Sequence, residues 1–114
     1  MAAVYVSNIV INAGTDFSQI FSLENSTSSS NLNLSNYTMS AQMRKHSGSS
    51  SATIFAASIF DPVAGNVSIS LGSTITTSLK PGRYVYDVII TDNITGIKTR
   101  VVEGMALVRE GVTR

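Results

Sequence analysis

Residues 79–91 decide the fold, and they read Leu79-Lys80-Pro81-Gly82-Arg83-Tyr84-Val85-Tyr86-Asp87-Val88-Ile89-Ile90-Thr91. From Arg83 to Thr91 most positions are aromatic or β-branched, and such residues favour the extended conformation. Successive side chains of a strand point to opposite faces, so this segment is apolar on both of its faces. We therefore expect a central strand that is covered on both sides, and one of these covers could be a contact between subunits.

The same stretch carries a corner motif. Pro81-Gly82 turns the chain just before the strand, and Tyr84 follows that turn. A tyrosine in this place can return its hydroxyl to the backbone of the preceding loop, which resembles the tyrosine corner of immunoglobulin-like and fibronectin-like sandwiches. Tyr84 is thus the corner candidate, and the alternative is a half-buried strand aromatic with no such bond.

Outward from this stretch, apolar and polar residues alternate with a period of two, and no long segment shows a helical stripe. The alternation predicts seven strands: Ala3–Ile11, Phe17–Leu23, Tyr37–Arg44, Thr53–Phe60, Val67–Leu71, Arg83–Thr91 and Ile97–Arg109. Short strands with frequent turn signals between them are typical of a two-sheet sandwich. The prediction is an all-β fold, an immunoglobulin-like two-sheet antiparallel sandwich of about seven strands.

The breaks between strands carry their own signals. Asp92–Gly96 supplies polar residues and a glycine that suit a short hairpin turn, which pairs the last two strands antiparallel. Asp61–Gly65 is a tight turn in which Pro62 pre-sets φ. Ser73–Leu79 lacks alternation and predicts one helical turn, ended by Pro81-Gly82.

Two residues and two loops mark irregularities in the pattern. Asn8 interrupts the first strand, which places that strand at a sheet edge. Gly104 lies inside the last strand and predicts a β-bulge or a close approach of another backbone. Glu24–Ser35 and Ser47–Ser51 are rich in small polar residues, and both predict mobile surface loops.

Length and composition bound the class of protein. The chain has 114 residues, which indicates a single domain spanning 1–114. With 43% hydrophobic and 13% charged residues, it is expected to fold, and its polarity comes from 18 Ser and 11 Thr hydroxyls. A formal net charge of +1 provides no basic face for nucleic acid or an anionic membrane, so we expect neither as a partner.

The absence of cysteine and of a leader sequence bears on the compartment. Without Cys the chain has no disulfide, no thiolate metal site and no Cys nucleophile, which suits folding in a reducing cytoplasm. Residues 1–14 lack the charged and apolar regions of a signal peptide, and no run of roughly 18 apolar residues occurs. We expect neither secretion by that route nor a membrane span.

Groups that could perform chemistry are few and scattered. His46, the one histidine, lies between Arg44-Lys45 and a Ser/Gly loop, where we expect it to be exposed and without a catalytic or metal-binding role. The four Asp and three Glu stand singly, and the glycines have no phosphate-binding spacing. We therefore expect no catalytic residue, cofactor, metal or small-molecule substrate, and not an enzyme.

Asp87 is the carboxylate that we expect to be partly buried, because it lies within the most apolar strand. Its expected partner is an arginine on a neighbouring strand, which could be Arg83, Arg100 or Arg109. A functional site around Asp87 is the alternative.

The order of several short motifs resembles that of a known family. The motifs span residues 14–23, 32–45, 61–69 and 79–88, followed by Arg100-Val101-Val102-Glu103-Gly104 and Gly111-Val112-Thr113-Arg114. This order looks like a small β-sandwich module of tailed-bacteriophage virion proteins, similar to the N-terminal domain of the baseplate upper protein of lactococcal phages. The closing Val112-Thr113-Arg114 looks like the ending of structural proteins from marine and cyanobacterial phages. The chain departs from the baseplate proteins in lacking their C-terminal extension.

The resemblance implies a non-enzymatic structural component of the phage particle. It would fold in the host bacterial cytoplasm, reside in the virion, and dock onto other virion proteins in multiple symmetric or homo-oligomeric copies. The tail, baseplate or fibre-attachment region is the expected location. Because Arg is enriched at interfaces, Arg100, Arg109 and Arg114 are candidate contact residues. The other structural or interaction candidates are Arg83, Tyr84, Tyr86 and Asp87.

Three alternatives stay open at this point. A capsid decoration protein of the same fold would differ from a tail protein in its copy number. A carbohydrate-binding or adhesin module would use Tyr5, Tyr37 and the Ser/Asn-rich loops against a glycan. An enzyme built on His46 and Asp87 is the third alternative.

Overall fold

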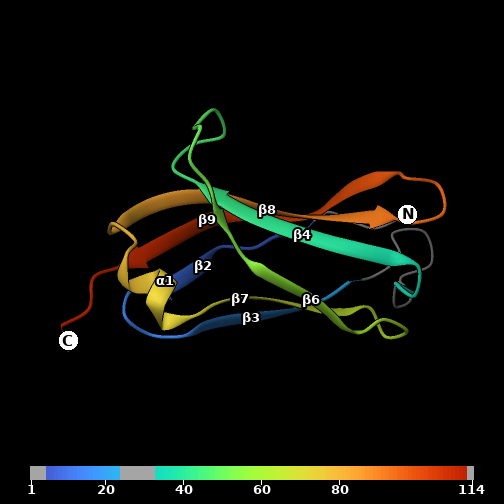
Figure 1. The fold of residues 1–114 in the computed structure, drawn as a ribbon, viewed down its shortest axis with the longest axis horizontal. Helices are drawn as coiled ribbons and strands as arrows, with labels where there is room; N and C mark the ends of the chain where they lie inside the picture. Colours follow the sequence, from blue (N-terminus) through green and yellow to red (C-terminus); the bar gives the residue numbers. More distant parts are fainter. Residues whose placement is uncertain (1–4, 24–32, 113–114) are drawn as a thin grey trace.

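The computed structural model describes residues 5–23 and 33–112, with only the backbone at Tyr5. Two β-sheets pack face to face, and one short helix lies at one end of the sandwich (Figure 1). The predicted all-β, two-sheet sandwich is confirmed. Among the residues described, no helix is long and apolar enough to cross a membrane.

Six strands form the larger sheet. Its order is β1 (Tyr5–Val6), β9 (Lys98–Arg109), β8 (Gly82–Asp92), β4 (Tyr37–Arg44) and β5 (Thr53–Ile54), and β2 (Ile9–Asn12) also pairs with β9. The smaller sheet has the order β3 (Phe17–Ser22), β7 (Asn66–Leu71) and β6 (Ala56–Asp61). The helix α1 (Ser73–Thr77) joins β7 to β8 and realises the helical turn predicted for this segment.

The core lies between the two sheets and is built from the inward side of the alternation. The smaller sheet contributes Phe17, Phe21, Val67, Ile69 and Leu71, and the larger sheet contributes residues such as Met43, Tyr86, Val88, Ile90 and Val102. Phe55 connects the layers, because its ring meets Phe17 at 6.1 Å and Tyr86 edge-on at 6.2 Å between centroids. Burial of these side chains is the main source of stability in a chain without disulfides.

Two of the seven predicted strands are each divided in two, which gives nine strands in the described part of the chain. The segment at Thr53–Phe60 changes sheets at Phe55: β5 pairs with β4, whereas β6 pairs with β7. The first strand breaks at Ser7-Asn8, between β1 and β2. Its predicted edge position is confirmed, since β1 and β2 pair only with β9.

The prediction of a wholly antiparallel sandwich was wrong at this edge. Both β1 and β2 run parallel to β9, with Tyr5 opposite Val102 and Ile9 opposite Ala106. Every other described pairing is antiparallel. Because period-2 alternation places the same side chains inward for either strand direction, the sequence pattern did not distinguish the two.

The corner predicted at Tyr84 is confirmed. Its hydroxyl donates a hydrogen bond of 2.8 Å to the carbonyl oxygen of Lys80, four residues upstream. Gly82 turns the chain between them with φ of 142°, a value that side chains rarely allow. The corner therefore fixes the path from α1 into β8.

The turn predictions are confirmed as well. In the β8–β9 hairpin, Asp92 Oδ1 accepts hydrogen bonds from the backbone N–H of Ile94 and Thr95, and Gly96 has φ of 76°. The 61–65 turn closes with a hydrogen bond of 3.3 Å from the Gly65 N–H to the Pro62 carbonyl oxygen. Of the predicted loop Glu24–Ser35, residues 24–32 lie outside the described residues, and the mobility of both loops stays a prediction.

The expected cover of β8 is present on its inner face, while on its outer face a contact between subunits stays a prediction. Tyr86, Val88 and Ile90 are buried toward the core, but on the other face Val85 is 39% exposed. No described element lies over this outer face, since β8 has β4 and β9 as sheet neighbours and the smaller sheet packs on the inner side. The uncovered face is where a functional surface is to be sought.

Candidate interaction surface

Four apolar side chains stand together on the outer face of the larger sheet. Val10 of β2 is opposite Leu107 of β9, and Met105, two residues earlier on β9, is opposite Val85 of β8. Their exposed fractions range from 39% for Val85 to 48% for Val10. We call Val10, Val85, Met105 and Leu107 the apolar stripe. Exposed apolar residues that are contiguous, rather than scattered singly, mark a contact surface.

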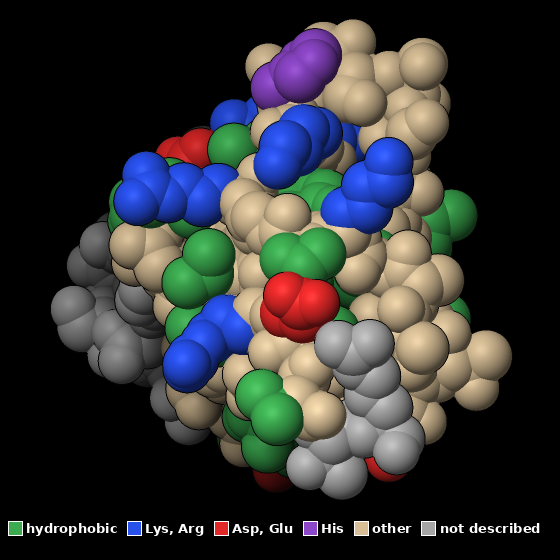
Figure 2. Space-filling model, turned by 90° about the vertical axis from the view of Figure 1, so that its left-hand side faces the viewer, with side chains coloured by type: hydrophobic (Ala, Val, Ile, Leu, Met, Phe, Trp, Pro, Cys, Tyr) green, Lys and Arg blue, Asp and Glu red, His purple; other side chains and the backbone are tan. Residues whose placement is uncertain are grey.

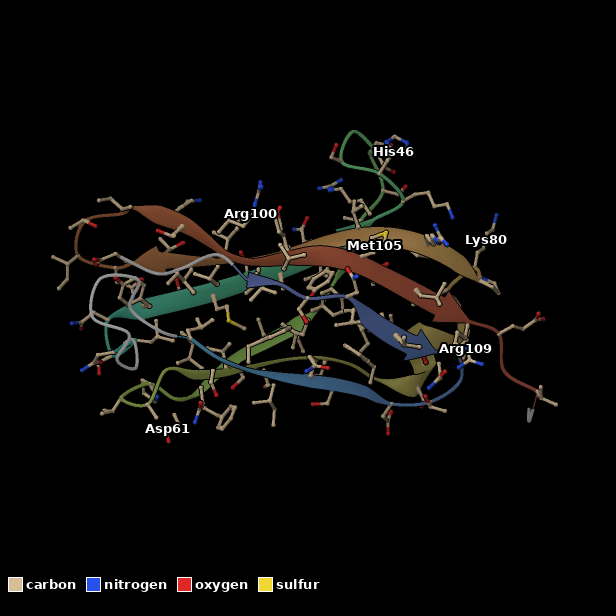
Figure 3. All side chains as sticks on the ribbon, turned by 180° about the vertical axis from the view of Figure 1, so that it is seen from behind. His46, Asp61, Lys80, Arg100, Met105 and Arg109 are labelled. Carbon is tan, nitrogen blue, oxygen red and sulfur yellow. The ribbon has the colours of Figure 1, made fainter. Side chains whose placement is uncertain are left out.

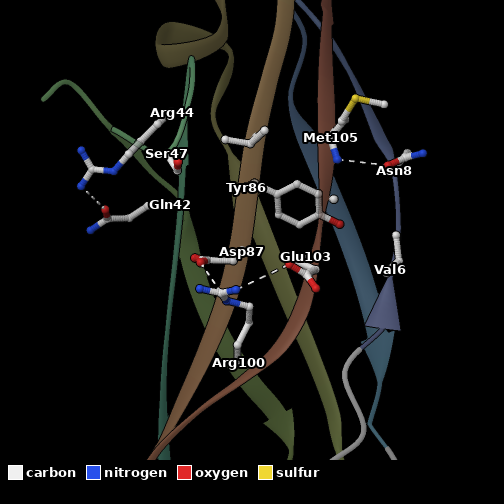
Figure 4. Close-up of a pocket in the computed structure, with 12 residues that line it drawn as sticks. Val6, Asn8, Gln42, Arg44, Ser47, Tyr86, Asp87, Arg100, Glu103 and Met105 are labelled. Atoms are coloured by element: carbon white, nitrogen blue, oxygen red, sulfur yellow. Dashed lines mark hydrogen bonds and ion pairs between the residues drawn. The ribbon is translucent and has the colours of Figure 1, made fainter. Parts of the chain in front are cut away.

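A groove of about 690 Å³ adjoins the apolar stripe (Figure 4). Val85 and Met105 form part of its lining, and Val6 of β1 and Gln42 of β4 lie toward its two sides. The groove is open to solvent along the outer face of the sheet. It offers a shape into which a protruding side chain or strand of another molecule could fit.

One end of the groove carries a charge cluster of two carboxylates bridged by one arginine, which leaves one formal negative charge. Asp87 and Glu103 are directly opposite each other in the β8–β9 register, an arrangement in which two carboxylates repel. Arg100 lies between them, with Nε 3.3 Å from Asp87 Oδ2 and Nη1 3.6 Å from Glu103 Oε2 (Figure 4). The Asp87–arginine pair predicted from the sequence is thus formed, and Arg100 is the partner among the three candidates.

A bulge in β9 brings Arg100 to the carboxylates. The register passes from Val88–Val102 to Ile89–Arg100, so Val101 has no partner and both valines are buried. Without this extra residue, alternation would point Arg100 into the core. The side chains of Arg100 and Asp87 are 54% and 35% exposed, so the pair adds little to stability and mainly neutralises local charge.

Arg44 borders the other side of the apolar stripe, opposite Val85 in the β4–β8 register. Its guanidinium donates to the Ser49 carbonyl oxygen at 2.7 Å and to Gln42 Oε1 at 3.1 Å. Both acceptors are neutral, so the Arg44 side chain is held in place while its charge is not balanced by a described carboxylate.

Arg83 and Arg109 also lie on the outer face. Arg83 is opposite Leu107, and Arg109 follows Leu107 by two residues on β9. Both side chains are exposed, and no described carboxylate forms an ion pair with either of them. Arg114 lies outside the described residues. Figure 2 shows Lys and Arg side chains gathered around hydrophobic ones at the α1 end of the sandwich, with acidic side chains among them.

The edge of the surface is fastened by three hydrogen bonds around Gly104. The Ser7 N–H donates to the Glu103 carbonyl oxygen at 2.9 Å, and the Met105 N–H donates to Asn8 Oδ1 at 3.0 Å. The Tyr86 hydroxyl donates to the Ser7 carbonyl oxygen. Burial raises the pKa of the Tyr86 hydroxyl.

Gly104 permits this arrangement, and the predicted close backbone approach is confirmed. A Cβ at this position would lie 2.8 Å from the Ser7 carbonyl carbon and closer still to its oxygen. Asn8, which interrupted the sequence pattern, replaces the missing ladder bond at the break between β1 and β2. Tyr86 therefore has a structural role at the sheet edge and is not an exposed contact residue.

The remaining candidates lie away from the groove. His46 is exposed on the loop after β4, and Lys45 places its Nζ 5.0 Å from the centre of the Tyr84 ring (Figure 3 labels His46). Tyr37, named for a glycan-binding role, is half-buried and packs against the core, while the side chain of Tyr5 is not described. Within the described ranges, no three His, Cys, Asp or Glu side chains cluster as metal ligands would.

The sequence pattern did not single out the apolar stripe. Val10, Met105 and Leu107 occur in strands that alternate imperfectly, and their exposure depends on β2 pairing parallel to β9. A signal was present in the two-sided apolarity of β8, whose Val85 is the stripe residue that the sequence indicated. The other three become neighbours only through the register of the folded sheet.

The comparisons with known proteins bear on the fold only. No protein-family model matches the chain, and no curated protein matches it. Among solved structures, the fold is similar to part of InlP from Listeria monocytogenes, with a TM-score of 0.51 and 13% sequence identity. The match covers 90% of this chain and 26% of the InlP chain, so this chain spans about a quarter of that protein and shares with it a sandwich architecture.

Proposed function

We propose that this chain is a non-enzymatic structural component of a tailed-phage particle that docks onto other particle proteins in multiple symmetric copies. The observation that carries the docking role is the apolar stripe, which no described residue covers on the outer face of β2, β9 and β8. Arg and Met are enriched where proteins meet, and both residue types stand on this face. The placement in a phage particle rests on the motif order described in the sequence.

A second surface suits attachment. Within residues 5–23 and 33–112, β3 is an edge of the smaller sheet, and its six residues, Phe17–Ser22, include no charge, proline or glycine. Edges without such residues accept a further strand, because one row of backbone N–H and C=O groups lacks a partner strand. The opposite edge, β6, is protected by an irregularity between Ile59 and Asp61 and by the following Pro62.

The position in the particle is proposed as the tail, baseplate or fibre-attachment region, with the capsid surface as the alternative. Both positions would use the same fold and the same outer face, so geometry favours neither. They differ in symmetry and copy number, because a decorated head carries many more equivalent sites than a tail.

The test is to quantify this chain in density-gradient-purified particles of the phage that encodes it, by peptide mass spectrometry against the major capsid protein. A few to some tens of copies per particle would support the tail position, and hundreds would support the head. Absence from purified particles would refute the structural role. A glycan array provides the control for the adhesin alternative, which requires saturable binding to a sugar.

A further inference from the structure

The charges around the apolar stripe are distributed unevenly. At one end of the groove, Asp87 and Glu103 are both engaged by Arg100, so that cluster retains one formal negative charge. Arg44, which lines the groove at β4, and Arg83 of β8 form no ion pair with a described carboxylate. The apolar stripe therefore has a bridged acidic cluster at one end, and arginines that pair with no described carboxylate beside β4, β8 and the end of β9.

Arg109 extends the cationic border along β9. Outward-facing positions on this strand are Glu103, Met105, Leu107 and Arg109, so the stripe residues of β9 lie between an acid paired with Arg100 and an arginine that pairs with no described carboxylate. Figure 3 places Arg109 and Lys80 at the same end of the molecule, with Met105 between that end and Arg100. We call Arg44, Arg83 and Arg109 the arginine border.

Protein interfaces match charge with opposite charge, and unbalanced cations at the rim of an apolar patch select against a basic partner. A nucleic acid fits less well, because the apolar stripe provides no aromatic side chains on which bases could stack and would contact charged phosphates instead. The chemistry that satisfies both parts of the surface is a polypeptide with carboxylates flanking apolar side chains.

We propose that the outer face of β2, β9, β8 and β4 binds an acidic protein segment, whose carboxylates meet the arginine border and whose apolar residues cover the apolar stripe. This inference specifies the chemistry of the docking partner and so deepens the proposed function. It rests on the proposed function only for the place where docking occurs, the phage particle. The partner's acidic residues pair with Arg44, Arg83 and Arg109, and its apolar residues contact Val85, Met105 and Leu107.

The probe is a random copolymer of glutamate and tyrosine, which combines carboxylates with apolar rings. Binding of the full chain is measured by biolayer interferometry at low and at physiological salt. Three comparison probes are polyglutamate, a lysine–tyrosine copolymer, and single-stranded oligothymidylate. We expect the glutamate–tyrosine copolymer to bind most tightly and the lysine–tyrosine copolymer not to bind.

Variants assign the binding to this face. Each of Arg44→Gln, Arg83→Gln and Arg109→Gln should weaken binding by about two- to fivefold, and the three together by about tenfold to a hundredfold. Met105→Ser should weaken binding to the copolymer but not to polyglutamate. Lys98→Gln, which removes a cation at the far end of β9, is the matched control and should leave the affinity within about twofold.

A gain-of-function variant keeps the test valid if affinity is low. Arg83→Glu combined with Arg109→Glu should reverse the preference, so that the lysine–tyrosine copolymer binds and the glutamate–tyrosine copolymer does not. Thermal unfolding of each variant confirms that it is folded, which is expected because both side chains are exposed.

Four outcomes would overturn the proposal. The first is that the glutamate–tyrosine copolymer does not bind, and the second is that Lys98→Gln weakens binding as much as the arginine variants do. The third is that oligothymidylate binds as tightly as the copolymer and depends on the arginine border in the same way. The fourth is that the free chain forms a dimer that Met105→Ser dissociates. The third would indicate nucleic acid and the fourth a second copy as the occupant. Presence in purified particles without copolymer binding would refute this partner chemistry alone, whereas binding without presence in particles would refute only the particle role.

Discussion

Replacing Gly104 with alanine tests whether the edge of the larger sheet depends on a close approach of two backbones. The added Cβ would lie 2.8 Å from the Ser7 carbonyl carbon, and ordinary contacts begin at about 3.4 Å. The chain at Ser7 must therefore move away by at least about 0.6 Å, and further at its oxygen.

This movement would weaken the three hydrogen bonds that fasten the edge, namely Ser7 to Glu103, Met105 to Asn8, and Tyr86 to Ser7. At about 1 kcal/mol for each bond, Gly104→Ala should lower the free energy of unfolding by about 2–3 kcal/mol. β2 keeps its own four register pairs with β9, so the loss should concentrate at β1.

The assay is urea unfolding followed by circular dichroism, together with amide hydrogen exchange at Ser7 and Met105. Gly48→Ala is the matched control, because Gly48 has no positive φ and the nearest atom to its added Cβ, in His46, lies at an ordinary contact distance of 3.6 Å. The control should stay within about 0.5 kcal/mol of the parent protein. If Gly104→Ala did the same and both amides kept their protection, the account of this edge would be wrong.

Three further predictions follow from single side chains. Tyr84→Phe should lower the free energy of unfolding by about 1 kcal/mol, because it removes the 2.8 Å hydrogen bond to Lys80. The control Tyr37→Phe should cost less, because the Tyr37 hydroxyl has no hydrogen bond in the described residues. Equal losses in urea unfolding would contradict the role of the corner. Burial raises the pKa of Tyr86 above its ordinary value of 10.0, so the unfolded chain releases this proton first as pH rises. The stability contributed by protonated Tyr86 is therefore fully present below about pH 10 and is lost as pH rises through the folded-state pKa, and Tyr86→Phe should show a shallower alkaline decline in melting temperature; parallel curves would refute this. Arg100→Gln should lower the free energy of unfolding by at most about 1 kcal/mol at low salt, because Asp87 then faces Glu103 with no cation between them. Adding Asp87→Asn should recover the lost stability. If the loss persisted in the double variant, Arg100 would act through packing.

The local chemistry of this chain was readable from its sequence, and its long-range pairing was not. Tyr84, Gly104 and the 92–96 turn each depend on residues with a specific stereochemical or hydrogen-bonding capacity, and each lies as predicted. The change of sheets at Phe55 and the parallel pairing of β2 left no such mark, because one inward-facing pattern serves either sheet and either direction.

The candidate surface shows the same division. The partner of Asp87 was narrowed to three arginines by the sequence, and the bulge at Val101 decided between them. The apolar stripe joins residues from β2, β8 and β9, so it could be recognised only after the register was known. The overall apolarity of β8 indicated that a second face existed, but not which neighbours shared it.

The parallel pairing of β1 and β2 with β9 also determines how the domain would carry tension. Because β1 and β2 run parallel to β9, a pull applied before β1 and after β9 draws these strands past each other. The backbone bonds of this seam are then loaded together in shear, whereas in a hairpin pulled open from its free ends they break one after another. Mechanical strength in a domain held between two anchors would accordingly reside at the seam between its first and last strands.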